Sequence, residues 1–318
     1  MPQSPPSSTR HAAVRTLAVD AQTAEVMSAL AAHGVEALLL KGLVVARRLY
    51  GADEPRFYGD TDLFVAPDAL GAARRTLGDL GYEPWIGDRS AELIGHHGTH
   101  WRRPGSLLEV DLHHRLTGVR ADPQALWDAL REHSTSMQVH GTPVRVPADA
   151  ALALHLALHA AQHGVAREQP WHDLRRGIEQ IDVAAWRAAA ALAARVDAVD
   201  AFGVGLRLLP EGAALARDLG VPPNRSRNAA LRVMAAPPVR LGLDRLSATP
   251  GLRAKARLAL GWTFPPADFM REWSDLARRG RGGLLLAYAW RPLVLAAQAR
   301  AALAAWRRAT RVTRGGRA

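Results

Sequence analysis

The chain has 318 residues, 48% apolar and 22% charged, which is typical of a folded protein and long enough for two domains. It contains no cysteine, which excludes disulfides, thiolate catalysis and cysteine-bound zinc, and which fits a cytoplasmic location. The net charge of +11 is local, because residues 276–318 hold ten arginines and no acidic residue, leaving 31 basic against 30 acidic residues elsewhere. This distribution disfavours a broad nucleic-acid surface and indicates a basic C-terminal helix and tail, exposed to solvent or in contact with RNA or a membrane.

The N-terminal region is expected to begin with a short disordered segment, residues 1–10, since MPQSPPSSTR lacks the apolar core of a signal peptide. Residues 11–33 then predict an amphipathic helix that ends at Gly34. No apolar run along the chain reaches the roughly 18 residues that a membrane-spanning helix needs. The longest, GGLLLAYAWRPLVLAA, is interrupted by Arg291 and Pro292.

A buried strand, VEALLL at 35–40, stops at Lys41-Gly42, and the pattern of a helix follows to residue 51. Lys41 is conspicuous because only two of the 41 basic residues are lysine. A loop that carries Arg56 leads into DTDLFVA, which alternates polar and apolar residues as a half-buried strand does.

The next segments predict an α/β region that ends near Pro147. They are a helix over 67–83, two strands within 99–116 around a Pro-Gly turn, a helix over 122–133 and a hairpin over 136–146. From Ala148 onward, alanine, leucine and arginine recur at helical spacing, which predicts an all-helical second domain. We therefore expect a lead-in at 1–10, domains at 11–147 and 148–309, and a basic tail at 310–318.

Carboxylates mark the candidate metal site. Asp60 and Asp62 lie two residues apart on one strand, so their side chains leave the same face and can converge on one cation. Asp111 lies on a second strand with Glu109 as its neighbour on the same face. Oxygen ligands from adjacent strands suit a Mg²⁺ ion that holds substrate phosphates. The pattern alone also fits a structural D-x-D pair on a solvated strand.

Lys41-Gly42 offers a candidate phosphate site. A strand followed by a helix presents backbone N–H groups at the helix start, and glycine allows a phosphate to approach closely. Arg56 lies four residues before Asp60, so its loop can bring a second cation to the same triphosphate. The alternative is structural, since a lysine at a strand end commonly extends its ammonium group to water.

The histidines allow three interpretations. His155, His159 and His163 line one helix face, and His96, His97, His100, His113 and His114 could add zinc ligands, although no H-E-x-x-H pattern is present. The helix face could instead pack structurally, or present one or two histidines to a cleft. His113 lies two residues beyond Asp111 and is the histidine most readily placed beside a metal. Asp173, in WHDL, could orient a histidine or cap a helix.

Taken together, LLLKG, RFYGDTDLFV, LGYE and EVDLHHRL resemble the nucleotidyltransferase superfamily with the DNA polymerase β-type fold. The closest resemblance is to a bacterial branch of largely uncharacterised nucleotidyltransferases in which a KG pair replaces Gly-Ser. It covers residues 35–116 by motif and extends more loosely through LHLALHAAQHG and WHDL. It implies an α+β fold, with a small mixed sheet and flanking helices followed by an all-helical domain. It also implies two-metal transfer of an NMP group from an NTP such as ATP.

The resemblance assigns roles by position. Asp60, Asp62 and Asp111 match the metal-binding and catalytic carboxylates, with Mg²⁺ or Mn²⁺ as the cofactor, and Gly42 matches the phosphate-contacting glycine. We expect Lys41 and Arg56 to bind the nucleotide as well. The remaining candidate cleft residues are Glu109, His113, His155 and His159.

The acceptor is left open by the sequence: a small molecule, a peptide, a protein or an RNA end would each fit, with nucleic acid the less favoured partner. Two rival functions also remain. One is a non-catalytic protein that binds nucleotide, RNA or membrane on the same fold. The other is a metal-dependent phosphohydrolase that uses the histidines.

Overall fold

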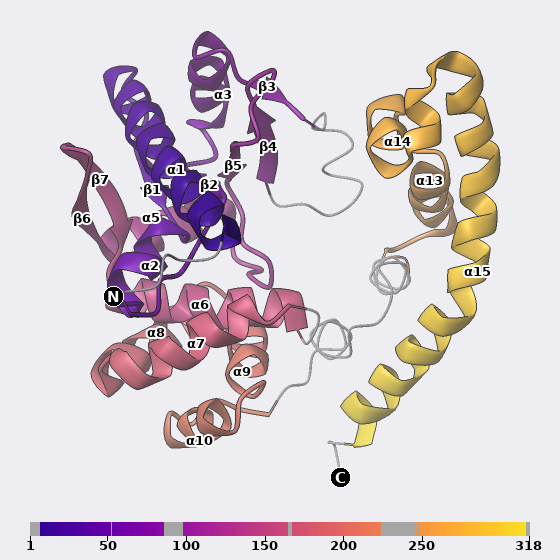
Figure 1. Cartoon of the computed structure of the whole chain (residues 1–318). Helices are drawn as coiled ribbons and strands as arrows, with labels where there is room; N and C mark the ends of the chain where they lie inside the picture. The colour runs from indigo at the N-terminus through magenta and orange to yellow at the C-terminus, as the bar shows by residue number, and fades with distance from the viewer. Residues whose placement is uncertain are drawn as a thin grey trace. The chain divides into compact units, whose positions relative to one another are not determined.

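The computed structural model of the protein describes residues 7–51, 53–85, 98–164, 167–223, 246 and 249–315. Its central feature is a five-stranded mixed sheet with strand order β1-β2-β5-β4-β3 (Figure 1). Contacts divide the chain into two compact units, one made of residues 1–85, 98–156 and 172–198 and the other of the remainder. The α+β fold with a mixed sheet, predicted from the sequence, is therefore confirmed. The domain boundary near residue 147 stays a prediction.

The first unit contains the sheet, a hairpin and the helices around them. The strands of the sheet are β1 (Ala37–Leu39), β2 (Asp60–Val65), β3 (Glu83–Pro84), β4 (Gly98–Arg102) and β5 (Glu109–His113), and the hairpin is β6 (Ser134–Val139) and β7 (Thr142–Pro147). The helices are α1 (Ser7–Ala32), α2 (Leu43–Leu49), α3 (Leu70–Asp79), α5 (Pro123–Glu132), α8 (Val183–Arg195), most of α7 (Gln169–Gln180) and the first half of α6 (Asp149–His163).

These elements follow the order predicted from the sequence. The helix α1 begins at Ser7, four residues earlier than expected, and residues 1–6 of the expected lead-in lie outside the described residues. The predicted Pro-Gly turn separates β4 from β5, and the predicted hairpin pairs β6 with β7. Asp122 caps α5, because its side chain accepts a hydrogen bond from the Gln124 N–H and Pro123 fills the first helical position.

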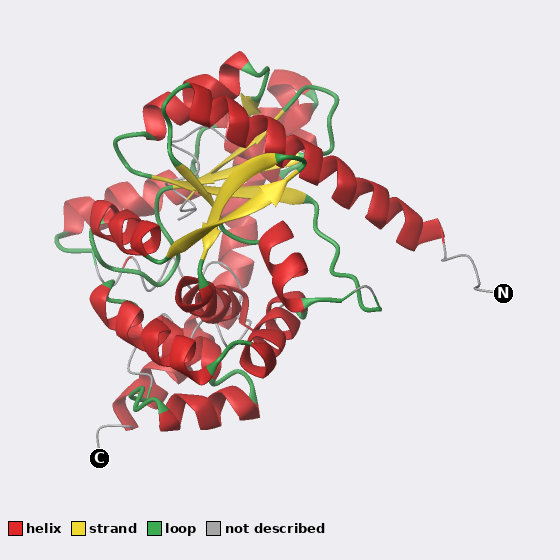
Figure 2. Ribbon diagram, turned by 90° about the vertical axis from the view of Figure 1, so that its left-hand side faces the viewer, coloured by secondary structure: helices red, strands yellow, loops and turns green. Residues whose placement is uncertain are grey.

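The alternation of β2 determines which side chains reach the site. Strands β2 and β5 pair in parallel, and β1 and β4 flank them in antiparallel pairing. On one face, Thr61 contacts α1, whose Gln22 and Thr23 side chains lie 3.1 and 2.9 Å from the Thr61 hydroxyl. On the opposite face, Phe64 stacks on Trp127 of α5, with ring centroids 6.2 Å apart. Asp60 and Asp62 share this second face, away from α1, which runs along the sheet in Figure 2.

Within its described residues, the second unit contains helices joined by turns and loops, and no strand. Besides the second half of α6 it contains α9 (Val199–Leu206), α10 (Pro210–Asp218), α13 (Leu252–Thr263), α14 (Ala267–Trp273), a 3₁₀ turn η2 (Asp275–Arg278) and α15 (Gly280–Gly315). The long helix α15 continues through Pro292. The buried Arg291 guanidinium lies 4.8 Å from the ring centroids of both Phe269 and Trp273 and donates to the Trp262 carbonyl. Within the described residues, no helix is long and apolar enough to cross a membrane.

Candidate active site

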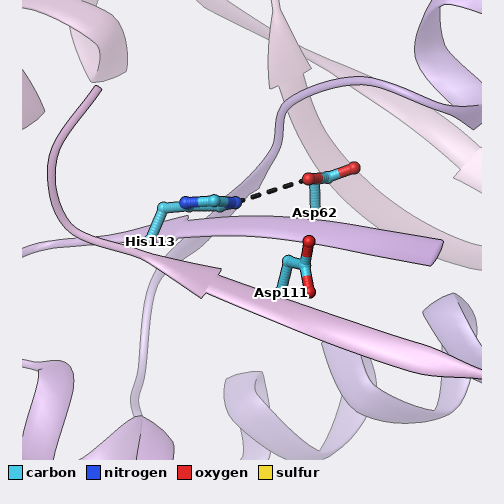
Figure 3. Close-up of side chains that lie close together, drawn as sticks. All are labelled: Asp62, Asp111 and His113. Atoms are coloured by element: carbon cyan, nitrogen blue, oxygen red, sulfur yellow. Dashed lines mark hydrogen bonds and ion pairs between the residues drawn. The ribbon is translucent and has the colours of Figure 1, made fainter. Parts of the chain in front are cut away.

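Three neighbouring strands bring the predicted carboxylates together. In the parallel pair of β2 and β5, Asp60 lies opposite Glu109 and Asp62 lies opposite Asp111. In the antiparallel pair of β5 and β4, His100 lies opposite Asp111. Directly opposed residues of neighbouring strands point to the same face, so these side chains form one polar cluster. Figure 3 shows Asp62, Asp111 and His113 on a common side of β2 and β5.

Asp62 is the most deeply buried member of the cluster, with 1% of its surface exposed, and each of its carboxylate oxygens has a cationic or polar neighbour. The Lys41 ammonium lies 2.8 Å from Oδ2, and the His113 Nε2 lies 3.4 Å from Oδ1. Burial alone would raise the pKa of Asp62, but Lys41 and the hydrogen bond to His113 outweigh burial and lower it. Asp62 is therefore ionised at neutral pH.

Asp60 has the opposite electrostatic environment. The neighbouring Asp62 carboxylate raises the pKa of Asp60, burial adds to the increase, and Lys41, 3.6 Å from Asp60 Oδ2, partly opposes it. For Lys41 itself, burial would lower the pKa, but the charges of Asp62 and Asp60 raise it overall. A protonated Lys41 thus lies against both carboxylates of the D-x-D pair.

The structure also places His100 in the cluster, a histidine that the sequence offered only as one of five further zinc ligands. Its Nδ1 lies 2.5 Å from Asp111 Oδ1, and this interaction raises the pKa of His100 against the opposing effect of burial. The alternation of THWRR on the strand before the Pro-Gly turn was the available signal, because the hairpin register sets His100 opposite Asp111.

Gly98 makes room for His113. It lies opposite His113 on β4, and a Cβ at this position would come within 2.5 Å of the His113 Nδ1. A larger residue would push the imidazole away from its contact with Asp62. The His113 Nε2 lies 3.4 Å from Asp62 Oδ1, and the place of His113 beside a metal stays a prediction.

Gly42 forms the turn between Lys41 and α2. Its dihedral angles, φ 65° and ψ −104°, lie in a region that residues with a side chain rarely adopt. Its carbonyl accepts hydrogen bonds from the Ala46 N–H at 3.0 Å and from the Arg56 Nη1 at 3.4 Å. Because α2 has seven residues, the candidate phosphate site depends on Lys41 more than on a long helix dipole.

Arg56, predicted to bind the nucleotide, forms a buried ion pair in this structure. Its Nε and Nη2 each donate to a different oxygen of Asp173, both at 2.7 Å, and the two side chains are 6% and 1% exposed. The Tyr50 hydroxyl donates to the same carboxylate at 2.8 Å. The ion pair therefore holds α7 against the loop before β2. Arg56 also donates to the Gly42 carbonyl, so the same guanidinium links Asp173 to the turn after Lys41.

The histidines of α6 divide between the two units. His155 belongs to the first unit and is 7% exposed; burial and the Lys41 charge lower its pKa to about 4, so it is neutral at pH 7. His159 belongs to the second unit, where its ring meets that of His163 edge to face, with centroids 4.7 Å apart. His96 and His97 lie outside the described residues.

Helix α1 makes hydrogen bonds to the strands and the loop that carry the cluster. The Gln22 amide donates both to the Thr61 hydroxyl and, at 2.9 Å, to the Glu109 carbonyl, which joins β2 to β5 at the level of the carboxylates. Asp20 accepts hydrogen bonds from Tyr58 and Arg47. Beside Asp60 and Glu109 there is an open cavity of about 370 Å³, and its lining also includes Ala12, Arg15, Phe57, Tyr58 and Gly59.

The donor atoms of the cluster fit a metal ion. Ligand atoms of Asp62, Asp111 and His113 lie within 4.8 Å of one another, and so do those of His100, Glu109 and Asp111. The two groups share Asp111. The structure thus brings five predicted residues together in one cluster: Lys41, Asp60, Asp62, Asp111 and His113.

A cluster of carboxylates on such a mixed sheet, with a lysine from the preceding turn, is the kind of site that the sequence resemblance implies for a nucleotidyltransferase. Residues 6–212 match the model of a family described as "uncharacterised nucleotidyltransferase". The chain belongs to this family of nucleotidyltransferases.

Several solved structures are similar to the chain at low identity and low TM-score. The antibiotic-resistance factor ANT(2'')-Ia is 14% identical, with a TM-score of 0.40, over 59% of this chain and 95% of its own. The lincosamide antibiotic adenylyltransferase LnuA is 14% identical, with a TM-score of 0.34, over 50% and 94%. A nucleotidyltransferase-like antigenic protein from Paracoccidioides brasiliensis is 14% identical, with a TM-score of 0.39, over 65% and 94%. No curated protein is similar enough to count as a match.

Proposed function

We propose that the protein transfers an NMP group from an NTP to a hydroxyl or phosphate of an acceptor, and that it requires Mg²⁺ or Mn²⁺. The observation that carries this proposal is the register of β2 and β5, which sets Asp62 opposite Asp111 and leaves Asp60 two residues away on the same face. Transfer between oxygen nucleophiles needs such a group of carboxylates, because both the attacking and the leaving oxygen require a cation.

The residues present fit a divalent cation. Asp60, Asp62 and Asp111 supply hard oxygen donors, and a positive group, the Lys41 ammonium, already lies against two of them. A bound divalent ion would neutralise the α-phosphate and stabilise the leaving pyrophosphate. His113 and His100 orient Asp62 and Asp111 through their ring nitrogens.

The side chains then take the following roles. Asp60, Asp62 and Asp111 hold the cation, and Asp111 also accepts the proton of the attacking hydroxyl. Lys41 gives a point charge to the β- or γ-phosphate, and the Gly42 turn lets the triphosphate come close to the backbone. Arg56 contributes through its ion pair with Asp173 and its contact with the Gly42 carbonyl, both of which fix the turn.

The test is incubation of the protein with Mg²⁺ or Mn²⁺, each of the four α-labelled NTPs and a cell extract. We expect transfer of label to one size class of acceptor. Asp60→Asn and Asp111→Asn should abolish labelling, whereas Asp79→Asn, the same substitution at the exposed end of α3, should not. Labelling that survives in both site variants would overturn the proposal.

Two other results would favour the rival functions. Release of NMP or inorganic phosphate without labelling of any acceptor would indicate a phosphohydrolase. No binding of any NTP with Mg²⁺ in calorimetry would indicate a protein that keeps the fold without the chemistry. Both readouts use the full chain.

A further inference from the structure

The ammonium group of Lys41 lies against the carboxylates of Asp60 and Asp62, two of the residues proposed to hold the divalent cation. It lies 2.8 Å from Asp62 Oδ2 and 3.6 Å from Asp60 Oδ2. The other oxygen of Asp62 faces His113. A cation that binds Asp62 through Oδ2 must therefore displace this lysine.

We propose that Lys41 is a tethered competitor of the divalent metal: it neutralises the D-x-D pair in the metal-free protein and leaves it when a nucleotide phosphate arrives. This inference rests on the proposed function. Lys41 then has two partners in turn: the carboxylates before the nucleotide binds, and a phosphate of the nucleotide afterwards. It also makes the site selective for the metal–nucleotide complex over the metal alone.

The physical basis is the cost of the charges involved. Asp62 is 1% exposed, and a buried carboxylate needs a positive partner, which Lys41 supplies. A metal ion that binds the carboxylates without nucleotide lies close to the Lys41 ammonium, which is 21% exposed. The two positive charges then repel each other, which weakens metal binding. A nucleotide removes this penalty, since its phosphates accept the ammonium. Metal and nucleotide are then coupled positively, and by reciprocity each strengthens the binding of the other.

The turn at Gly42 allows Lys41 to change partner with little movement of the sheet. Lys41 precedes a glycine with φ 65° and lies outside β1, which ends at Leu39. Its long side chain ends in three rotatable donors, so the ammonium can move while the backbone stays in place. Arg56 and Asp173 hold the turn from the other side through the Gly42 carbonyl.

The experiment measures the affinity of the full-length protein for Mn²⁺ alone, by calorimetry and by the electron paramagnetic resonance of unbound Mn²⁺. Lys41→Met should bind Mn²⁺ about tenfold more tightly than the wild type, because the competitor is gone. Lys41→Gln should do the same, and it keeps a polar end beside Asp62 in case Lys41→Met does not fold. The control is Arg75→Met. Arg75 is exposed on α3, outside the sheet, and its loss should change the affinity less than about twofold.

A second arm adds a non-hydrolysable NTP analogue. In the wild type the analogue should raise the affinity for Mn²⁺ by at least about tenfold, and in both Lys41 variants this increase should be smaller, because the part that Lys41 contributes is gone. Equal or weaker binding of Mn²⁺ alone by both Lys41 variants would overturn the inference, as would an equal gain in Arg75→Met. The first arm needs no turnover. If both Lys41 variants bind Mn²⁺ more tightly and the wild type labels no acceptor with any NTP, Lys41 competes with the metal but the proposed function is rejected.

Discussion

Asp60, Asp62 and His155 show how a few ångströms of environment change the chemistry of a side chain. The two aspartates are two residues apart, yet their pKa values move in opposite directions. At Asp62, Lys41 and His113 outweigh burial, whereas at Asp60 the charge of Asp62 and burial outweigh Lys41. His155, buried near Lys41, is held neutral. Each of these shifts has a measurable effect.

His155 should make the protein acid-sensitive. Its pKa is about 4 in the folded protein, and its surroundings include the charged groups of Lys41, Asp62, His113 and Asp173. An unfolded chain takes up the proton near pH 6.5, so it binds more protons between pH 6.5 and 4, and stability falls as the pH drops through this range. The loss is of the order of 3 kcal/mol. Denaturant unfolding at several pH values should show a flatter dependence for His155→Leu.

The control for this prediction is His33→Gln. His33 is exposed at the end of α1, so this variant removes a histidine that is not buried. An unchanged slope in His155→Leu would mean that other groups cause the acid sensitivity.

Gly42→Ala should destabilise the protein by about 1 to 3 kcal/mol through backbone strain. The new Cβ would meet its nearest neighbours, the Asp60 carbonyl and the Tyr58 ring, at 3.5 Å, which is ordinary contact, so the cost comes from φ 65° and not from a clash. Gly51→Ala is the matched control: no atom lies within 4 Å of its added Cβ, and its backbone is not left-handed. Thermal unfolding of the two variants, followed by circular dichroism, distinguishes strain from a general effect of alanine.

Between elements, a buried ion pair joins Arg56 with Asp173. It ties the loop before β2 to α7, although 117 residues separate the two. Arg56→Met should lower the free energy of unfolding by about 3 to 5 kcal/mol, since it leaves a buried carboxylate without its cation. The double variant Arg56→Met/Asp173→Leu should recover much of this loss. Chemical denaturation of both variants and of Asp173→Leu completes the cycle.

An exposed pair in the same unit provides the comparison. Arg120 and Asp197 share the same bidentate geometry, with distances of 3.0 and 2.6 Å, but their side chains are 58% and 57% exposed. Arg120→Met should cost less than about 1 kcal/mol. Equal losses for Arg56→Met and Arg120→Met would show that burial does not decide the strength of these pairs.

The strands that carry the site could be predicted from the sequence, but several of the side-chain contacts within the site could not. Alternation located β2 and β5, put Asp60 and Asp62 on one face of the first strand and put Asp111 and Glu109 on one face of the second, because the period of a strand is a local property. The partner of Arg56 could not be predicted in this way, since Asp173 comes from a helix far along the chain. Lys41 was expected at a phosphate, and its ion pairs with Asp60 and Asp62 depend on the register of β2, which no local pattern contains.

At the scale of the whole chain, the net charge of +11 is concentrated in the last 43 residues, which have ten arginines and no acidic residue. Binding to heparin should therefore depend on this segment. Glutamine at four of these arginines should lower the salt concentration of elution from a heparin column more than glutamine at four exposed arginines of the first unit. The two sets are Arg307, Arg308, Arg311 and Arg314, and Arg75, Arg115, Arg131 and Arg187. Equal shifts would indicate a basic surface that extends over the body of the protein.

The parallel pairing of β2 with β5 also determines when the site can exist during folding. The two strands are separated by more than 40 residues, which include α3, β3 and β4, so Asp62 and Asp111 meet only after a long loop has closed. Contacts of such sequence separation form slowly compared with helices and hairpins. A nascent chain therefore carries its helix α1 and the D-x-D strand for some time before it has a place to hold a cation, and the ability to bind Mn²⁺ should appear with the slowest step of refolding.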